Sequence, residues 1–542
     1  MRLTFLPTLL YLSVTCALGA VLPTATTDVS SRAASGDKLV FAHFMMGIVS
    51  NRASSSDYDD DMRRAKAYGI DAFALNIGTD TFTDVQLEYA YQSAAAFDMK
   101  VFLSFDFNWY KPAISSAVVG AKIAAFASKP AQLRVDNKVF VSSFRGDGLD
   151  VAAVRSVAGS DLYFIPNFHP GQGDFSQIDG AFNWQGWDND GNNKAPKGGV
   201  TVTVSDGDNA YRNALGNKPY MAPASPWFFT HYGSEVDYSK NWVFPGDLLW
   251  YNRWNEILQL APRYVEIVTW NDYGESHYVG PLSSKHTDDG ASKWSNDMPH
   301  NGWLDMAKPY IAAYKAGQTT VNSQISSDQI VYWYRPAPAS VNCDSTDNTM
   351  GAANNNTGNY FNGRPDGWQT LNDNIFIVPL LTSAGTVTIN SGGTIYSIDA
   401  PAGASSWSIP MHLGPQAFSL SRNNVQVMSA TSLKEIKQEC SCGLYNFNSY
   451  VGTVPAGAYD ALTPDGLSAF TNGLKVACAA TPSLPASPPA TAAPTATGVA
   501  GGQGNTVPYI RKDGTTVTWL TDPNLQLTTP ASGSYSVSDV WR

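Results

Sequence analysis

Long apolar runs and positive charge are both scarce in this 542-residue chain. Beyond the first twenty residues no apolar run reaches the roughly 18 residues that a membrane helix needs, so we expect no membrane anchor. Lys and Arg number 35 against 46 Asp and Glu, which gives a net charge of -11. An acidic chain is a poor partner for nucleic acid or an anionic membrane surface. Together these shortages favour a neutral substrate.

Metal-binding and phosphate-binding motifs are also missing. None of the seven His stands in a spacing such as H-x-H or H-E-x-x-H, and no Gly-rich phosphate loop is present. The segment 188–193 (DNDGNN) lacks the later Glu of a calcium loop, so an Asx-turn loop is the better interpretation. We therefore expect no metal and no cofactor.

Cysteine is rare, and its placement is informative. Of five Cys, Cys16 lies in the leader, and the other four occupy the C-terminal third. Cys440 and Cys442 are too close to pair easily with each other, so each is expected to bond to Cys343 or Cys478, with both connectivities open. Two disulfides are typical of an oxidising compartment.

The amino terminus predicts export. Residues 1–20 combine Arg2, an apolar run and the small pair Gly19 and Ala20, the pattern of a cleaved secretory signal peptide. The polar segment 21–32, which ends at Arg32, is interpreted as a short propeptide. We expect a secreted, extracellular protein that acts as a monomer.

Residues 33–320 alternate strand-like runs with helical stretches, which predicts an α/β fold. Eight βα repeats favour a (β/α)8 TIM barrel, and an open doubly wound sheet is the alternative. Helices are expected at 56–68, 83–95 (with Thr83 as N-cap) and 247–260. The predicted strands are 39–46, 72–77, 101–107, 139–144, 162–167, 179–184, 220–224 and 264–270.

Polar and aromatic side chains follow these strands where a barrel would place its site. Because they come from unrelated segments, their convergence on one rim points to a binding surface. The residues concerned are Asn76, Asp106, Asn108, Arg145, Asn167, His169, Asn183, Trp184, Trp187, Ser225, Trp227, His231 and Tyr232.

Two carboxylates three residues apart close the eighth strand, in the motif 269–278 (TWNDYGESHY). A pair such as Asp272 and Glu275 is what hydrolysis of a glycosidic bond requires: one carboxyl protonates the leaving oxygen and the other activates water or attacks the sugar. The competing interpretation is a D-x-x-E helix cap.

Period-two alternation along the strands predicts which way further acidic side chains point. It points Glu266, Val268 and Trp270 inward, with Glu266 as a buried network residue. Asp106 becomes a third inward carboxylate, and we favour a hydrogen-bonded structural role for it over direct chemistry. Asp71 begins the second strand at the opposite end and is expected to be structural.

Several stretches resemble glycoside hydrolase family 71, the fungal α-1,3-glucanases or mutanases. They occur in order as LVFAHFMMG (39–47), GIDAFALNIG (69–78), FLSFDFN (102–108), PNFH (166–169), PWFFTHY (226–232), KNWVFPG (240–246) and WNDYGES (270–276). The resemblance implies endo-hydrolysis of α-1,3-glucan, as in mutan and fungal cell walls, with inversion, and places the acid chemistry on Asp272 and Glu275. The family also has an Asp at the position of Asp71.

Within that chemistry we assign Glu275 as general acid, kept protonated by burial against Trp270 or Tyr278, and Asp272 as general base; the two roles could be exchanged. Trp184, Trp227, Tyr273 and Trp242 are the expected aromatic platforms for sugar rings. The expected substrate-binding residues are His43, Asn76, Asp106, Asn108, Asn167, His169, Trp184, Trp227, His231, Trp270 and Tyr273. The alternatives are a glycosidase of another linkage and a non-catalytic polysaccharide-binding wall protein.

The remaining chain divides by composition. Residues 329–478 show alternating runs and hairpin patterns, such as TVTI (386–389) with TIYSI (394–398), and predict a β-sandwich accessory domain. It either binds glucan through Trp333, Trp368 and Trp407 or only buttresses the barrel. A Pro/Ala/Thr-rich linker (479–506) and a short tail (507–542) follow.

Overall fold

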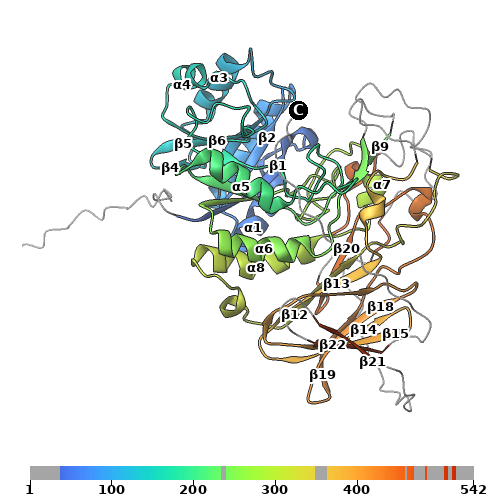
Figure 1. Ribbon diagram of the computed structural model, residues 1–542. Helices are drawn as coiled ribbons and strands as arrows, with labels where there is room; N and C mark the ends of the chain where they lie inside the picture. Colours follow the sequence, from blue (N-terminus) through green and yellow to red (C-terminus); the bar gives the residue numbers. More distant parts are fainter. Residues whose placement is uncertain are drawn as a thin grey trace, which may run out of the picture.

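The computed structural model describes residues 37–233, 240–347, 363–457, 460–468 and 482–484, together with the backbone of 506–510 and 516–520. An α/β part comes first, and a part made almost only of strands follows it (Figure 1). The expected signal peptide, propeptide and tail side chains lie outside the described residues. Within the described residues, no helix is both long and apolar enough to span a membrane.

A curled sheet of eight parallel strands organises the α/β part. Its spatial order is β6-β5-β3-β2-β1-β11-β8-β7, and each of the eight strand predictions overlaps one of these strands. The strands are β1 (Leu39–Met45), β2 (Ala72–Ile77), β3 (Lys100–Asp106), β5 (Lys138–Phe144), β6 (Leu162–Pro166), β7 (Ala181–Phe182), β8 (Tyr220–Ala224) and β11 (Tyr264–Ile267). The short strand β4 (Arg134–Val135) pairs antiparallel with β5.

The two end strands, β6 and β7, approach each other without a ladder between them in the described chain. The backbone N–H of Asp179 donates to the carbonyl of Phe164 at 3.0 Å. The side-chain amide of Asn167 donates to the carbonyl of Phe182, also at 3.0 Å. These bonds bring the two edges of the curled sheet together beside Asn167.

Aromatic rings fill the inside of the curl. Phe41, Phe102 and Phe140 pack edge to face, with ring centroids 4.7 to 5.3 Å apart. Parallel strands that are buried on both faces appear in the sequence as nearly continuous apolar runs, and these runs allowed the strands to be predicted. The interior is thus a packed core, and only the ends of the strands are free to form a site.

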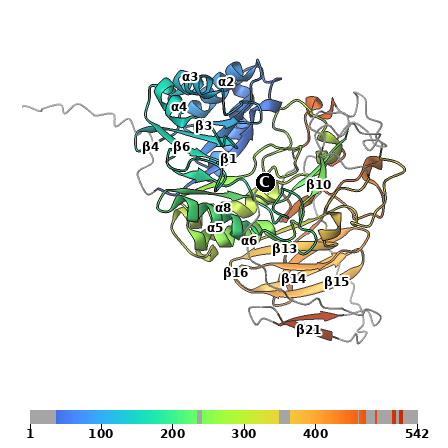
Figure 2. The same ribbon diagram turned by 45° about the horizontal axis from the view of Figure 1, so that its top comes forward.

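Helices cover the outer face of the sheet (Figures 1 and 2). The helix predictions for 56–68, 83–95 and 247–260 correspond to α1, α2 and α6. Thr83 is the first helical residue, and Phe82 takes the N-cap position without a side-chain bond. The helices are α1 (Asp59–Ala67), α2 (Thr83–Ala96), α3 (Ser116–Phe126), α4 (Val151–Ala158), α5 (Val204–Leu215), α6 (Leu249–Leu260), α7 (Ser292–Ser295) and α8 (Asn301–Lys315).

The C-terminal part contains two antiparallel sheets whose buried side chains form one cluster. Tyr332 of one sheet stacks on Phe418 of the other, with centroids 3.8 Å apart. Both predicted hairpins, β14–β15 and β18–β19, are present. One sheet holds β12 (Gln329–Tyr334), β13 (Asn374–Leu381), β16 (Gly403–Ala404), β17 (Trp407–Pro410) and β20 (Tyr450–Val454); the other holds β14 (Gly385–Ser391), β15 (Thr394–Ala400), β18 (Gln416–Arg422) and β19 (Val425–Thr431). A hairpin of β21 (Thr506–Ile510) and β22 (Thr516–Leu520) lies against β15.

This β-rich part buttresses the sheet and its helices. Trp333 is fully buried and donates its indole N–H to the carbonyl of Asp247 at 2.8 Å. Nε2 of His300, at the start of α8, lies 2.9 Å from the carbonyl oxygen of Ser449, which accepts its hydrogen bond. Trp407 is buried, and the half-buried Trp368 lies under the guanidinium of Arg364. Two of the three tryptophans considered for glucan binding are therefore core residues.

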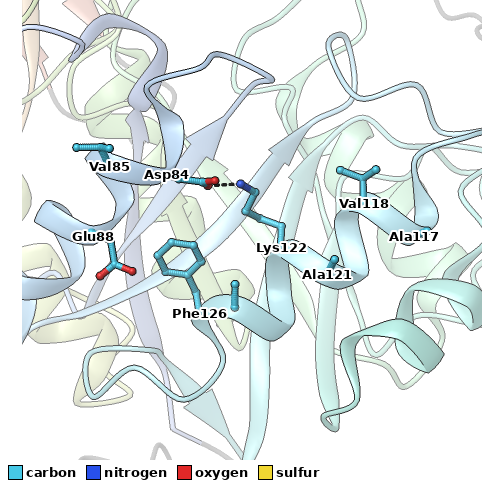
Figure 3. Close-up of a pocket in the computed structure, with 9 residues that line it drawn as sticks. Asp84, Val85, Glu88, Ala117, Val118, Ala121, Lys122 and Phe126 are labelled. Carbon is cyan, nitrogen blue, oxygen red and sulfur yellow. Dashed lines mark hydrogen bonds and ion pairs between the residues drawn. The ribbon is translucent and has the colours of Figure 1, made fainter.

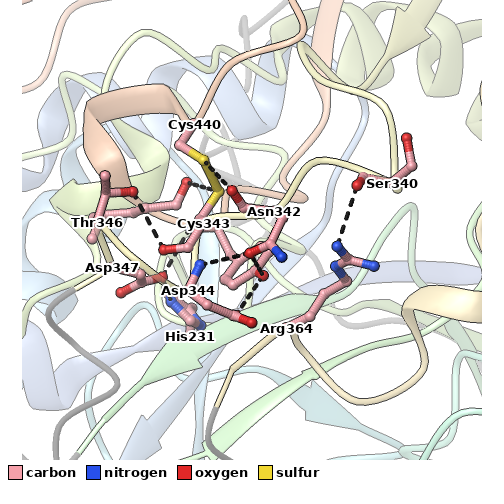
Figure 4. Close-up of a disulfide and its surroundings, with 11 residues drawn as sticks. His231, Ser340, Asn342, Cys343, Asp344, Thr346, Asp347, Arg364 and Cys440 are labelled. Atoms are coloured by element: carbon pink, nitrogen blue, oxygen red, sulfur yellow. Dashed lines mark hydrogen bonds and ion pairs between the residues drawn. A yellow bond between two sulfur atoms is a disulfide. The ribbon is translucent and has the colours of Figure 1, made fainter.

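A disulfide joins Cys343 to Cys440, as one of the two open connectivities required (Figure 4). Cys442 is also disulfide-bonded, and Cys478 lies outside the described residues. The bond closes the loops that lead from β12 and β19 back toward the α/β part.

A buried ion pair ties α6 to α5. Arg253 is fully buried; its Nη1 and Nη2 contact the two oxygens of Asp208 at 2.6 and 2.8 Å, and its Nε donates to the carbonyl of Pro223. Arg253→Met should lower the free energy of unfolding by about 3–5 kcal/mol, because Asp208 is left buried without its counter-charge.

Urea unfolding followed by tryptophan fluorescence measures this loss. The matched control is Arg63→Met, which removes an exposed pair with Asp60 and should cost less than about 1 kcal/mol. Equal midpoints for the two variants would show that the buried pair does not hold α5 and α6 in place.

Candidate active site

A pocket of about 230 Å³ opens at the carboxyl ends of the parallel strands. Its wall combines three carboxylates with amides, imidazoles and aromatic rings. The lining residues are His43, Met45, Asn76, Asp106, Asn108, Phe144, Arg145, Asn167, His169, Trp184, Gln185, Trp187, Asn193, Tyr211, Phe228, Lys240, Asp272 and Glu275. Both expected catalytic residues and seven of the expected substrate-binding residues, namely His43, Asn76, Asp106, Asn108, Asn167, His169 and Trp184, are among them.

Trp227 and His231 do not line this pocket. Both are buried: His231 belongs to β9 (Phe229–Tyr232), which pairs with β10 (Lys240–Val243), and Trp227 lies two residues before β9. Trp227 donates its indole N–H to the carbonyl of Phe447, and His231 lies between the side-chain oxygens of Asn241 and Asp347 (Figure 4). Both side chains are buried by contacts with the β-rich part. A pattern of strand ends cannot predict such long-range contacts.

Trp270 and Tyr273 are also buried away from the pocket lining. Trp270 donates its indole N–H to Asp61 of α1, and the Tyr273 hydroxyl donates to the carbonyl of Pro281. The prediction that Trp270 points inward is wrong, because β11 ends at Ile267 and the period of two ends with it. Trp242 offers no open face either, since the ammonium of Lys194 lies 3.3 Å from its ring centroid.

Asp272 and Glu275 are held in one tight turn. The backbone N–H of Glu275 donates to Oδ1 of Asp272 at 2.9 Å, so the capping bond of a D-x-x-E sequence is present. Both carboxylates nevertheless face the pocket. Gly274 permits this turn, because a Cβ there would lie 2.4 Å from the Tyr232 hydroxyl. The local cap and a catalytic pair are therefore compatible in one motif.

Two basic side chains hold Glu275 as an anion. Lys240 forms an ion pair with Oε1, and Nε2 of His277 lies 2.9 Å from Oε2. Burial alone would raise the pKa of Glu275, but these two neighbours outweigh it and lower the pKa to about 2. A carboxyl in that environment is a poor proton donor.

Asp272 has the opposite tendency. Burial raises its pKa, the charge of Glu275 adds to that effect, and His277 and Lys240 offset it only in part. Its side chain is 15% exposed, open to the pocket. Environments that push two neighbouring carboxyl groups apart in pKa are typical of an acid and base pair. Here they favour Asp272 as the proton donor, the reverse of the first assignment from sequence.

Asp106 is the third carboxylate of the pocket, at the end of β3. Burial raises its pKa, while a hydrogen bond from the backbone of Asn108 and the charges of His43 and Arg145 oppose that rise. Nδ1 of His43 in turn lies 2.7 Å from Oε1 of the fully buried Glu266. The buried network expected at Glu266 is thus confirmed, and it supports the pocket floor.

Asp71 lies at the far end of the sheet from the pocket. Its carboxylate accepts a hydrogen bond from the backbone of Val40 and pairs with Lys315 of α8 at 2.7 Å. Both partners are structural, in agreement with the orientation that the strand pattern predicts.

Among the described residues, one group has the spacing of a metal site. Asp272, Glu275 and His277 each offer a ligand atom, and these atoms lie within 4.8 Å of one another. Both oxygens of Glu275 already have partners in Lys240 and His277. The ammonium of Lys240 thus supplies positive charge at this group.

A larger hollow lies outside the sheet, between α2 and α3 (Figure 3). Its lining is mostly Ala and Val, and its two acids, Asp84 and Glu88, pair with Lys122 and Lys129. Because its acids are paired with lysines and the rest of the lining is apolar, this hollow offers no free set of polar groups like that of the smaller pocket.

Lys240 is the important residue that the sequence pattern did not assign. It begins β10, in a hairpin inserted after the seventh predicted strand. A search for polar residues at the ends of the eight parallel strands therefore does not find it. The motif KNWVFPG begins with it, and this was the only available signal.

The family of the chain follows from comparison with known proteins. A family model described as glycosyl hydrolase family 71 matches residues 36–463. The chain belongs to glycosyl hydrolase family 71. This membership agrees with a pocket whose charged centre is a set of carboxylates.

Named fungal relatives agree with the family. A mutanase of Penicillium rubens is 40% identical over 80% of this chain and 92% of its own length. The glucan endo-1,3-alpha-glucosidase agn1 of Schizosaccharomyces pombe is 33% identical, with coverage of 77% and 95%. An ascus wall endo-1,3-alpha-glucanase of the same yeast is 27% identical, with coverage of 76% and 96%.

The electrostatics of Glu275 are testable without substrate. Lys240→Met should raise the pKa of Glu275, because the effect of burial is then opposed by His277 without the ammonium. A depressed pKa stabilises the fold above the ordinary Glu value, and this stabilisation is lost as the pH falls toward 2; the variant should lose it at higher pH.

Carbon-13 NMR of glutamate-labelled protein, with the signal assigned through Glu275→Gln, measures the titration directly. Lys240→Arg keeps the charge and is the control. If the Glu275 midpoint is the same in wild type and Lys240→Met, the ion pair does not set its ionisation.

Proposed function

We propose that this protein is an endo-acting α-1,3-glucanase that hydrolyses internal α-1,3-glucosidic bonds. The observation that carries the proposal is the pocket in which Asp272 and Glu275 have oppositely shifted pKa values beside a third carboxylate, Asp106. Membership of the family and the named substrates of the relatives support this linkage and the endo mode.

The proposal also covers the fold that carries the pocket. We infer that the curled sheet is a (β/α)8 barrel closed where β6 meets β7, and that the β-rich part is a β-sandwich. The bonds at Asp179 and Asn167 support closure, and the shared core of the two C-terminal sheets supports the sandwich. The pocket then lies at the carboxyl end of the barrel, where such folds carry their sites.

In the proposed mechanism, Asp272 is the general acid. Its carboxyl is kept neutral by burial and donates its proton to the glycosidic oxygen as the bond to the anomeric carbon breaks. Glu275 remains ionised through Lys240 and His277, and its negative charge stabilises the positive charge that develops on the sugar ring.

The spacing of the acids supports a base outside the Asp272 and Glu275 pair. Inversion needs two carboxyl groups about 6.5–9.5 Å apart, with water between them and the sugar. Ligand oxygens of Asp272 and Glu275 lie within 4.8 Å of each other, which is too close for that arrangement. We therefore place the base on Asp106, which lines the same pocket from β3 and takes a proton from the attacking water.

The close pair also favours a second mechanism, retention with Glu275 as nucleophile, since retaining pairs are about 5–5.5 Å apart. The two mechanisms differ in the product. Inversion of an α-linkage releases a β-configured end, whereas retention releases an α-configured end.

Around the acids, the sugar rings are held by polar side chains and one aromatic face. His43, Asn76, Asn108, Asn167 and His169 offer hydrogen-bonding groups to hydroxyls, and the half-buried Trp184 packs against His43 at 4.8 Å. Aromatic faces combine apolar contact with a polar tip, which suits a neutral sugar.

We also propose that the protein is exported and works as a monomer. The Cys343–Cys440 disulfide fits an oxidising compartment, and the leader-like residues 1–20 fit secretion.

The deciding experiment measures reducing ends released from insoluble α-1,3-glucan, with product anomers followed by proton NMR. Early β-configured ends are expected. Early α-configured ends would replace inversion by retention through Glu275. Cleavage of other glucans alone would replace the linkage, and binding without cleavage would indicate a polysaccharide-binding protein.

Variants separate acid from base. Asp272→Asn and Asp106→Asn should each lower kcat on glucan by about 10²–10⁴-fold, the usual contribution of proton transfer. With α-glucosyl fluoride, whose leaving group needs no proton, Asp272→Asn should recover much of its rate and Asp106→Asn should not.

Asp84→Asn, an exposed acid outside the pocket, is the matched control and should retain wild-type rates. Recovery by Asp106→Asn, with none by Asp272→Asn, would exchange the two roles.

A further inference from the structure

Trp109 is an unusual tryptophan in this molecule. Its side chain is 60% exposed, whereas the other tryptophans with described burial are buried or half-buried. Single exposed apolar residues are common on protein surfaces, so exposure alone assigns no role. What makes its exposure informative is that Trp109 lies next to the pocket.

The residue follows the pocket wall directly. Asp106 and Asn108 line the pocket from the end of β3, and Trp109 is the next residue. The backbone N–H groups of Trp109 and Tyr110 both donate to the carbonyl of Asp106, at 3.1 and 3.0 Å. The turn that presents the carboxylate of Asp106 to the pocket therefore also fixes the backbone of Trp109.

The indole is also held from below. Gly78 follows β2, two residues after the pocket residue Asn76, and a Cβ on Gly78 would lie 3.2 Å from Cδ1 and 3.4 Å from Cγ of Trp109. The missing side chain lets the ring lie against the backbone of the neighbouring strand end. A ring that is already held loses little conformational freedom when a ligand stacks on it.

The size of the pocket shows that a glucan must extend beyond it. Its volume of about 230 Å³ is below the roughly 300–1,000 Å³ of ordinary small-molecule pockets. A polysaccharide cut at an internal bond must therefore cross the rim on both sides of the acids. The rim between the ends of β2 and β3 is where the Trp109 indole is exposed.

We propose that Trp109 is the stacking platform of an outer subsite, which binds a glucosyl residue of the same chain beyond the residues at the cleaved bond. The inference rests on the proposed function for the identity of the sugar. The flat indole packs against the apolar C–H face of a pyranose ring, and no charge is needed because the ligand is neutral.

The test compares Trp109→Ala, Trp109→Phe and wild type on α-1,3-linked oligosaccharides of increasing length. Trp109→Ala should lower kcat/KM on long chains by roughly three- to tenfold, the factor expected for one aromatic stacking contact. The loss should appear in KM, vanish for the shortest chain that is cleaved, and be largely restored by Trp109→Phe. Gly78→Ala, which presses on the ring without removing it, should show a similar length dependence.

Ile114→Ala is the matched control, since Ile114 is an apolar residue of the same loop and is 80% exposed. It should behave as wild type at every length. A loss in Trp109→Ala that is equal at all lengths, or no loss, overturns the subsite. If the enzyme cleaves only another glucan, and the length dependence appears there, the linkage fails and the subsite stands.

Discussion

The ammonium of Lys240 and the imidazole of His277 fix the charge of Glu275, and the rest of the site depends on that contact. With Glu275 ionised, a second negative charge on the nearby Asp272 becomes unfavourable, and this adds to burial in raising the pKa of Asp272. In the proposed mechanism, one ion pair thus divides two similar carboxyl groups into an anion and a proton donor. Neither residue would hold its role without the hairpin that carries Lys240.

The scaffold keeps these groups in place by packing around them. Aromatic rings pack the inside of the curled sheet, and Trp227, His300 and Trp333 reach across to backbone carbonyls at the junction with the β-rich part. These bonds cross between segments more than 80 residues apart in the sequence. The β-rich part is therefore a support for the site, whatever else it binds.

Much of the fold and most of the pocket-lining residues proposed for the site could be predicted from local patterns. Buried parallel strands are continuous apolar runs, so the eight strands could be predicted. Within these strands, period-two alternation also gave the correct direction for the side chains of Asp106 and Glu266. The prediction of site residues failed where contacts between distant segments determine whether a side chain is buried. Four residues that follow strands and were expected to bind substrate are instead buried by partners such as Phe447, Asp347 and Asp61: Trp227, His231, Trp270 and Tyr273. The ion pair of Lys240 with Glu275 also lies outside any local rule, and with it the proton affinities of the two acids.

The protonation of the two acids is the central claim, and a neutron structure of the protein exchanged into heavy water at about pH 3, above the pKa of Glu275 and below that of Asp272, tests it most directly. The account predicts a deuterium on the carboxyl of Asp272 and none on Glu275, whose oxygens should accept from Lys240 and His277. A deuterium on Glu275, with Asp272 bare, would contradict the account and return the role of acid to Glu275.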